Sequence, residues 1–249
     1  MAGSVRGARH VRRGEGNEDA VLAVTTEHSA TVAVADGHGS IHCPRADRGS
    51  AFAVESAIAT LRVSPPLALE DVAPSIVAGW RAAVDEDLEL DPPTEPPRRE
   101  LYGTTLLAAH AAGQVVRLVQ VGDGDVAVAS GNVVERPVIA ADTGSALVTE
   151  SLCQDDAAER VQVVDVDVDA TSLVLLASDG FGGAFVESAW HEPVLREIWT
   201  QLEDMTPDEL GAAIESWCRG PAEVAGDDAS IGLLMAGMEP GRIDDDASA

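Results

Sequence analysis

The sequence contains no lysine, so all sixteen of its basic side chains are arginine, against 43 acidic residues. The formal net charge of −27 at pH 7 disfavours nucleic acid and anionic membranes as partners, because both would be repelled over the whole surface. No apolar run approaches the roughly 20 residues that a membrane-spanning helix needs. Residues 1–19 also lack the apolar core of a secretory signal. We therefore expect a globular protein with no membrane partner.

Cysteine is scarce as well. Cys43, Cys153 and Cys218 are odd in number and far apart, which argues against a disulfide framework and favours a reducing, cytoplasmic location. The hydrophobic content of 45% and the mean hydropathy of +0.04 are ordinary for a chain that buries a full core.

A length of 249 residues could hold one large domain or two small ones. The motifs described below begin by Asp19 and end at Asp227, so they favour one domain over residues 1–238. We expect residues 239–249, which include Asp244, Asp245 and Asp246, to form an acidic, disordered tail.

Hydrophobic periodicity divides the chain into strands and helices. Helical patterns cover residues 47–62, 69–90, 188–203 and 206–218. The last of these has Thr206 as N-cap, Pro207 at the first helical position and Glu209 at the third, the layout of a capping box. Strand patterns cover residues 20–25, 30–35, 103–109, 114–121, 125–129, 161–169 and 172–177, and residues 227–235 read as an acidic turn that leads into a buried strand. The three segments between 103 and 129 are separated by glycines, and we expect them to form an antiparallel meander.

The segment from Val161 to Asp169 alternates valine with aspartate, as does a strand with one buried and one solvated face. It also resembles the start of a calcium-binding loop. Ala170 stands where that loop needs glycine, however, and Leu176 stands where it needs a bidentate glutamate. A solvated strand face is therefore the better interpretation.

Four predicted strands have aspartate at one end, in the sequences Asp36-Gly37-His38-Gly39, Asp123-Gly124, Asp179-Gly180 and Asp227-Asp228. Each is a common turn by itself. Converging carboxylates would repel one another, whereas bound divalent ions would turn this repulsion into attraction. Oxygen ligands without a zinc-type His/Cys cluster indicate Mg²⁺ or Mn²⁺.

The same motifs, in this order, resemble the metal-dependent protein phosphatases of the 2C type. The motifs that carry the resemblance are Asn17-Glu18-Asp19, Val34-Ala35-Asp36-Gly37-His38-Gly39, Gly103-Thr104-Thr105, Val121-Gly122-Asp123, Ser178-Asp179-Gly180 and Gly226-Asp227-Asp228. The opening Gly7-Ala8-Arg9-His10 is similar to a bacterial branch of that family. The resemblance implies an α+β fold, a four-layer α-β-β-α sandwich of two antiparallel sheets flanked by helix pairs.

The resemblance also implies an activity and a ligand set. A phosphoserine/phosphothreonine phosphatase of this type hydrolyses phosphomonoesters with a metal-activated water and forms no phosphoenzyme intermediate. The site would hold two Mn²⁺ or Mg²⁺ ions and a weaker third. Asp36 would bridge the first two ions, Asp179 and Asp227 would complete the first, and the carbonyl of Gly37 would bind the second. Glu18 and Asp19 would hold metal-bound waters, and Asp123 would bind the third ion. His38 would protonate the departing oxygen as general acid.

The sequence departs from the family pattern at several positions. The family has a phosphate-gripping arginine four residues before the position of Glu18, where this chain has Gly14. Either Arg12 or Arg13 could take that role, because a Gly-rich loop absorbs a small shift. Asp228 replaces an asparagine, so Asp227 or Asp228 could be the ligand, and Asp227 matches the pattern better.

These departures leave two functional hypotheses. The first is an active phosphatase, expected to be monomeric, that acts on phosphoserine or phosphothreonine proteins and opposes a cognate kinase. The second is a pseudophosphatase that binds phosphoproteins or a partner kinase without turnover. Its support is Gly14 in place of arginine and Gly124-Asp125 after Asp123.

Overall fold

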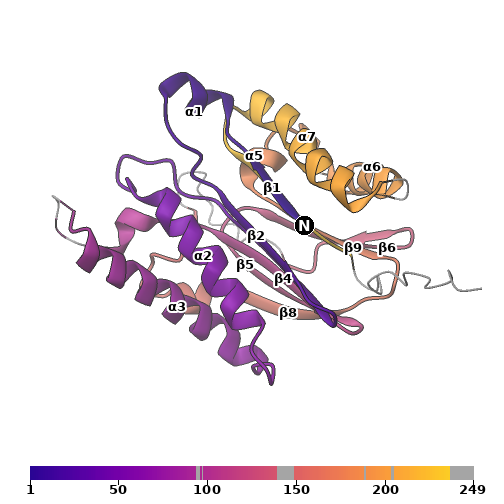
Figure 1. Cartoon of the computed structure of the whole chain (residues 1–249), viewed down its shortest axis with the longest axis horizontal. Coiled ribbons are helices and arrows are strands. Elements are labelled where there is room, and N and C mark those ends of the chain that lie inside the picture. The colour runs from indigo at the N-terminus through magenta and orange to yellow at the C-terminus, as the bar shows by residue number, and fades with distance from the viewer. Residues whose placement is uncertain (94–95, 97, 139–148, 188, 203–204, 236–249) are drawn as a thin grey trace, which may run out of the picture.

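The computed structural model describes the whole chain except residues 94–95, 97, 139–148, 188, 203–204 and 236–249. Two five-stranded antiparallel sheets form its centre (Figure 1). In strand order, the first sheet contains β2 (Ala20–Thr25), β3 (Ser29–Ala35), β4 (Leu106–Ala112), β5 (Val115–Val121) and β8 (Gln162–Asp167). The second contains β1 (Ala2–Val5), β10 (Ala229–Met235), β9 (Ser172–Ala177), β6 (Asp125–Ser130) and β7 (Val133–Glu135).

A pair of long helices covers the outer face of each sheet (Figure 1). The helices α2 (Ala46–Leu61) and α3 (Leu69–Leu90) pack on the first sheet, while α6 (His191–Leu202) and α7 (Pro207–Ala225) pack on the second. The short helices are α1 (Ala8–Arg13), η1 (Arg99–Tyr102), α4 (Ala157–Arg160) and α5 (Asp179–Gly182). The predicted α-β-β-α sandwich is therefore confirmed. None of the described helices is long and apolar enough to cross a membrane.

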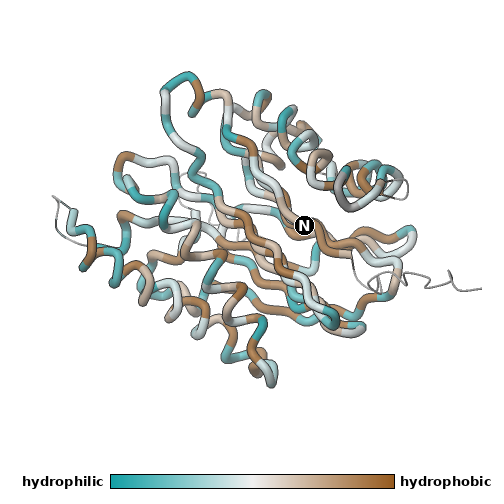
Figure 2. The backbone as a smooth tube through the Cα atoms, in the orientation of Figure 1, coloured by the Kyte–Doolittle hydropathy of each residue, from teal (hydrophilic) through white to brown (hydrophobic). Residues whose placement is uncertain are grey.

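Strand alternation explains the three layers of apolar packing. In β3, Val32 and Val34 face the second sheet, whereas Ala33 and Ala35 face α2 and α3. Both faces are buried, so these strands are almost entirely hydrophobic, as the brown stretches in the centre of Figure 2 show. The edge strand β8 differs, because its aspartates are exposed while Val164 and Val166 pack between the sheets. The predicted solvated strand face is confirmed.

The predicted meander over residues 103–129 is wrong. β4 and β5 do form a hairpin, but β6 pairs with β7 and β9 in the other sheet. The turn Gly122-Asp123-Gly124 carries the chain across the sandwich, and Gly122 has a φ of 101° that L-residues rarely adopt. Both sheets supply equally apolar strands, so local pattern does not distinguish pairing within a sheet from packing between sheets.

Helix boundaries agree with the sequence prediction to different degrees. α3 has the predicted limits, and Thr206 and Glu209 form the predicted capping box of α7. α7 extends beyond residue 218, however, and ends at Ala225, where Gly226 has a φ of 80°. β1 and α1 lie before residue 20, where the sequence pattern predicted neither a strand nor a helix. The single domain over residues 1–238 stays a prediction, and the tail at 239–249 lies outside the described residues.

Candidate active site

A pocket of about 430 Å³ lies at the end of the sandwich where β3 and β9 finish. The described residues that line it are Asp36, Gly37, His38, Gly39, Ser40, Cys43, Thr105, Asp123, Thr149, Asp179 and Asp227. The four strand-end aspartates singled out in the sequence thus come from both sheets and meet in one pocket. None of the described residues lining it is lysine or arginine.

The Gly103-Thr104-Thr105 motif positions Asp36 from the neighbouring strand. The backbone N–H of Asp36 donates to Thr105 Oγ1 at 3.1 Å, and Thr104 Oγ1 donates to the carbonyl of Asp36 at 2.9 Å. The N–H of Thr105 donates to the same carbonyl at 2.9 Å. The backbone of Asp36 is therefore fixed from several sides, while its carboxyl group faces the pocket.

Gly37 is required by close packing. A Cβ atom at this position would lie 2.6 Å from the carbonyl oxygen of Glu18 and 2.8 Å from that of Ala46. Any larger residue would push the strand end away from the start of α2. This glycine therefore allows the backbone after Asp36 to approach its neighbours and line the pocket.

Burial of the carboxyl groups, with repulsion between them, dominates the electrostatics of the pocket. Burial raises the pKa of Asp36 well above its ordinary value, and the charges of Asp19 and Asp179 raise it further. Desolvation also raises the pKa of Asp179, to which Asp123 and Asp227 add. Asp36 and Asp179 share a hydrogen bond, which requires one of the two carboxyl groups to be protonated. The carboxylates are thus close enough to compete for a proton.

The two neighbouring aspartates 227 and 228 have different surroundings. Asp227 lines the pocket. Asp228 is buried and accepts hydrogen bonds from the backbone N–H groups of Gly7 and Glu18, both at 2.7 Å. His10 Nδ1 lies 2.9 Å from the same carboxylate. Asp228 therefore ties the N-terminal segment to β10, and of the pair only Asp227 faces the pocket.

Glu18 and Asp19 lie behind the pocket and are not part of its described lining. Asp19 accepts a hydrogen bond from Ser230 Oγ at 2.6 Å, and burial raises its pKa well above its ordinary value. Glu18 Oε2 is buried without a hydrogen-bond partner, and a Cβ atom added at Gly39 would lie 3.1 Å from it. β2 and β3 pair as antiparallel neighbours with Ala20 opposite Ala35, which places both acids beside Asp36.

His38 is half-buried and lines the pocket. Its backbone N–H donates to the carbonyl of Gly103 at 3.0 Å, which fixes the turn after Asp36. Burial lowers the pKa of its imidazole, while the charges of Asp123 and Asp179 oppose this shift. The histidine is therefore within the field of the pocket carboxylates.

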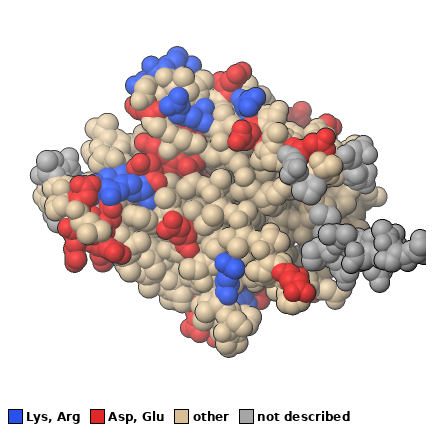
Figure 3. All heavy atoms as spheres, viewed as in Figure 1, with Lys and Arg blue, Asp and Glu red and all other residues tan. Residues whose placement is uncertain are grey.

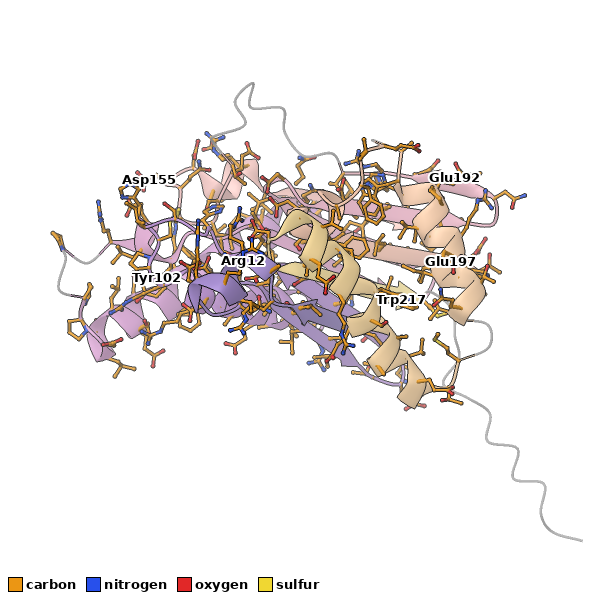
Figure 4. The ribbon with its side chains drawn as sticks, turned by 90° about the horizontal axis from the view of Figure 1, so that it is seen from above. Arg12, Tyr102, Asp155, Glu192, Glu197 and Trp217 are labelled. Carbon is orange, nitrogen blue, oxygen red and sulfur yellow. The ribbon has the colours of Figure 1, made fainter. Side chains whose placement is uncertain are left out.

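Arg9, which was not among the arginines expected from the sequence, contacts one of the pocket carboxylates although it is not among the described residues that line the pocket. Its guanidinium contacts the carboxylate of Asp227, and its backbone N–H donates to the carbonyl of Gly226 at 2.8 Å. Arg12 and Arg13 do not line the pocket; Arg12 is exposed, and Arg13 pairs with Glu15 at 3.8 Å. Figure 3 shows arginine side chains gathered over α1, and Figure 4 labels Arg12 there.

The donor set has the chemistry of a divalent-cation site. Asp36, Asp123, Asp179 and Asp227 supply only oxygen atoms, which are the ligands of Mg²⁺ and Mn²⁺. Among the described residues, no three acidic, histidine or cysteine side chains already stand in an ion-binding arrangement. Three of these carboxyl groups have other partners in this structure: Asp227 contacts Arg9, Asp123 accepts a hydrogen bond from Thr149 at 2.8 Å, and Asp36 neighbours Asp179.

Comparisons with solved structures identify the fold. The catalytic domain of the serine/threonine phosphatase PstP, in complex with two manganese ions, is similar with a TM-score of 0.62, 18% identity and coverage of 94% of this chain and 95% of that one. PppA of Pseudomonas aeruginosa is similar with a TM-score of 0.64 and 19% identity, and the match covers 94% of each chain. PstP/Ppp of Mycobacterium tuberculosis is similar with a TM-score of 0.60 and 16% identity, and the match covers 95% of this chain and 97% of that one. The fold is therefore that of bacterial serine/threonine phosphatases.

A family model described as protein phosphatase 2C matches residues 6–217, which include every pocket aspartate except Asp227. The chain belongs to the protein phosphatase 2C family. A comparison with curated protein sequences gave no significant match.

Proposed function

We propose that the protein is a metal-dependent protein serine/threonine phosphatase that hydrolyses phosphomonoesters by direct attack of water, without a phosphoenzyme intermediate. The observation that carries this proposal is the convergence of four aspartates and His38 in one pocket that no described lysine or arginine lines. Such a pocket favours a divalent cation over a structural role, because buried carboxylates that repel one another destabilise the folded state.

The chain's own residues divide the work. Asp36, the carbonyl of Gly37, Asp179, Asp227 and Asp123 would hold Mn²⁺ or Mg²⁺, with Glu18 and Asp19 behind them. When bound, paired ions lower the pKa of a water and neutralise phosphoryl oxygens. His38 donates a proton to the departing seryl or threonyl oxygen.

Arg9 contacts the substrate phosphate in this proposal, in place of the expected Arg12 or Arg13. Two observations support it. Its guanidinium already binds an oxyanion at the pocket, the carboxylate of Asp227. A guanidinium can also bind phosphate with two parallel hydrogen bonds. The substrates would be phosphoserine or phosphothreonine proteins; a cognate kinase and a monomeric state stay predictions.

The test is phosphate release from a phosphothreonine peptide with Mn²⁺ or Mg²⁺, comparing the wild type with Asp179→Ala. We expect release that depends on metal, stops with EDTA and is lost in the variant. Glu89→Lys, an exposed substitution on α3, is the matched control for folding and purity. Absence of release with either metal, while calorimetry still shows ion binding, would favour the pseudophosphatase alternative.

A further inference from the structure

A second cavity, of about 620 Å³, lies between α5, α6 and α7 on the outer side of the second sheet. Its walls are apolar and largely aromatic. They include Phe181, Phe185, Trp190, Ile198, Trp217 and Pro221. This cavity, here called the aromatic groove, shares no described lining residue with the carboxylate pocket.

The walls of the aromatic groove are held in place by specific contacts. Phe185 stacks on Trp190 with ring centroids 4.9 Å apart and an interplanar angle of 11°. On the other side, Trp217 Nε1 donates to Gln201 Oε1 at 2.9 Å, and Gln201 Nε2 donates to Glu197 at 2.7 Å. Figure 4 labels Trp217 on α7 and Glu197 on α6. The groove is therefore preformed, which lowers the entropy that a ligand loses on binding.

The lip of the groove exposes apolar surface to solvent. Val186 lines the groove and has a relative exposure of 103%, the largest among the exposed large hydrophobic residues described. Val224, three residues after Pro221 on α7, is 72% exposed. Exposed apolar surface beside an aromatic cavity is the usual mark of a site that a partner covers.

The acidic residues around the groove favour a partner with basic side chains. Glu187 and Glu197 are the charged residues among those that line it, and both are acidic. Neither has an ion-pair partner within the described chain, whereas the nearby Glu192 pairs with Arg196 at 2.8 Å. Residues 236–249 of this chain contain four acidic residues against one arginine, so they carry the wrong charge for this rim.

We propose that the aromatic groove binds a segment of a partner protein that inserts one or two large apolar side chains and carries Lys or Arg beside them. The apolar side chains bury against the tryptophans and phenylalanines, and the basic residues pair with Glu187 and Glu197. The helix α5 connects the two sites, since Asp179 at its start lines the carboxylate pocket and Phe181 lines the groove. A partner docked here lies next to the carboxylate pocket.

The probe is the fluorescein-labelled hexapeptide Lys-Arg-Leu-Leu-Arg-Lys, measured by fluorescence anisotropy at about 150 mM salt, where long-range attraction to the acidic protein is screened. Two control peptides replace either both leucines by alanine or all four basic residues by glutamate. We expect saturable binding of the probe and no saturable binding of either control peptide. Val186→Asp and Glu187→Lys should each weaken binding of the probe roughly tenfold, as loss of a central contact does.

The matched control variants are Leu90→Asp and Glu89→Lys at the end of α3, a helix that packs on the other sheet. Leu90 is 78% exposed, so its substitution has the same chemistry as Val186→Asp without touching the groove. We expect these controls to bind the probe within about twofold of the wild type. All four variants change exposed positions, and their melting curves verify that they fold.

Three results would overturn the proposal. One is absence of saturable probe binding to the wild type. Another is binding of either control peptide as tight as that of the probe, or a loss of probe binding in the control variants as large as in the groove variants. Either outcome would assign the binding to the general charge of the protein. The third is a concentration-dependent dimer in sedimentation equilibrium that Val186→Asp abolishes, which would make a second copy of this chain the occupant.

Discussion

Two regions of the molecule concentrate aspartate, and they treat it in opposite ways. Where α2, α3 and η1 meet, Asp87 and Asp91 are surrounded by Arg45, Arg48 and Tyr102, a group here called the arginine-aspartate cluster. Arg48 contacts both aspartates, and Arg45 Nη1 lies 3.4 Å from Asp87. In the carboxylate pocket, the aspartates mainly face one another.

The pKa values show the consequence of this difference. The hydrogen bond from Arg48 lowers the pKa of Asp91, so the folded state favours its charged form. Burial and neighbouring carboxylates raise the pKa of Asp36 instead. The chain thus compensates acidic charge where it holds helices together and compensates it only in part, through Arg9 at Asp227, where a divalent cation would supply the remainder.

The largest effect is expected from Asp36→Asn. The variant removes a central carboxylate of the pocket, and we expect turnover of a phosphothreonine peptide to fall by roughly 1,000-fold or more, the scale of lost electrostatic stabilisation of a transition state. Manganese-dependent phosphate release measures this. Activity within about tenfold of the wild type would refute the assignment of the site.

Asp87→Asn, in the arginine-aspartate cluster, should have the opposite profile. Asp87 is buried, and its loss leaves Arg45, Arg48 and Tyr102 with one partner fewer. We expect the free energy of unfolding to fall by about 2–3 kcal/mol, as for other buried charge pairs broken on one side, with turnover of the folded enzyme unchanged. Urea unfolding measures the change in stability, and the phosphopeptide assay measures turnover. A free energy of unfolding equal to that of the wild type would mean that the arginine-aspartate cluster does not stabilise the fold.

His38→Ala separates proton donation from the other roles of the pocket. We expect roughly 100-fold slower hydrolysis of a phosphothreonine peptide but less than about threefold slower hydrolysis of p-nitrophenyl phosphate, whose leaving group needs little protonation. Steady-state kinetics on both substrates give the comparison. Equal losses would mean that His38 acts in another way.

Arg9→Ala tests the phosphate contact. We expect KM for the phosphopeptide to rise about tenfold with a smaller change in kcat, because a charge-assisted hydrogen bond to the substrate is lost. Arg12→Ala and Arg13→Ala are the matched controls on the same helix and should leave KM unchanged. A larger effect at either control position would restore the assignment made from the sequence.

The smallest effect concerns pH and the metal-free protein. Asp36 has a higher pKa in the folded state than its unfolded pKa near 3.8. Its ionisation therefore begins to lower the free energy of unfolding when the pH rises above about 3.8, and this destabilisation reaches its full size once the pH exceeds the folded pKa. Asn carries no such charge. In EDTA, the melting temperature of Asp36→Asn should therefore exceed that of the wild type increasingly as the pH rises from about 4 to 7. A constant difference across this range would contradict the raised pKa.

The resemblance to the 2C-type phosphatases predicted the sandwich, and the pocket aspartates could be selected from the residues themselves, because an aspartate at a buried strand end is a local pattern. Asp123 shows the limit: its place in the pocket depends on the crossing from β5 to β6, which the strands' apolar composition does not reveal. Arg9 was missed because α1 shifts the spacing between the N-terminal segment and Glu18. Gly14, with a φ of 71° at the end of Ala8–Arg13, was the signal for that helix.

The aromatic groove could not be predicted at all. Phe181, Trp190 and Trp217 have the composition of ordinary core residues, and the cavity arises only from how α5, α6 and α7 are placed on the second sheet. The family pattern favoured Asp227 over Asp228, but it gave no physical reason for the difference. The distinction depends on the backbone N–H groups of Gly7 and Glu18, more than 200 positions away in sequence.

The central claim is that the carboxylates of the pocket are only partly compensated within the protein, by Arg9 at Asp227, because divalent cations supply the rest. Calorimetric titration of Mn²⁺ into the wild type, Asp36→Asn and Asp87→Asn tests it most directly. We predict saturable binding to the wild type and to Asp87→Asn, with loss of that binding in Asp36→Asn. Equal binding to all three proteins, or none to the wild type, would contradict the account.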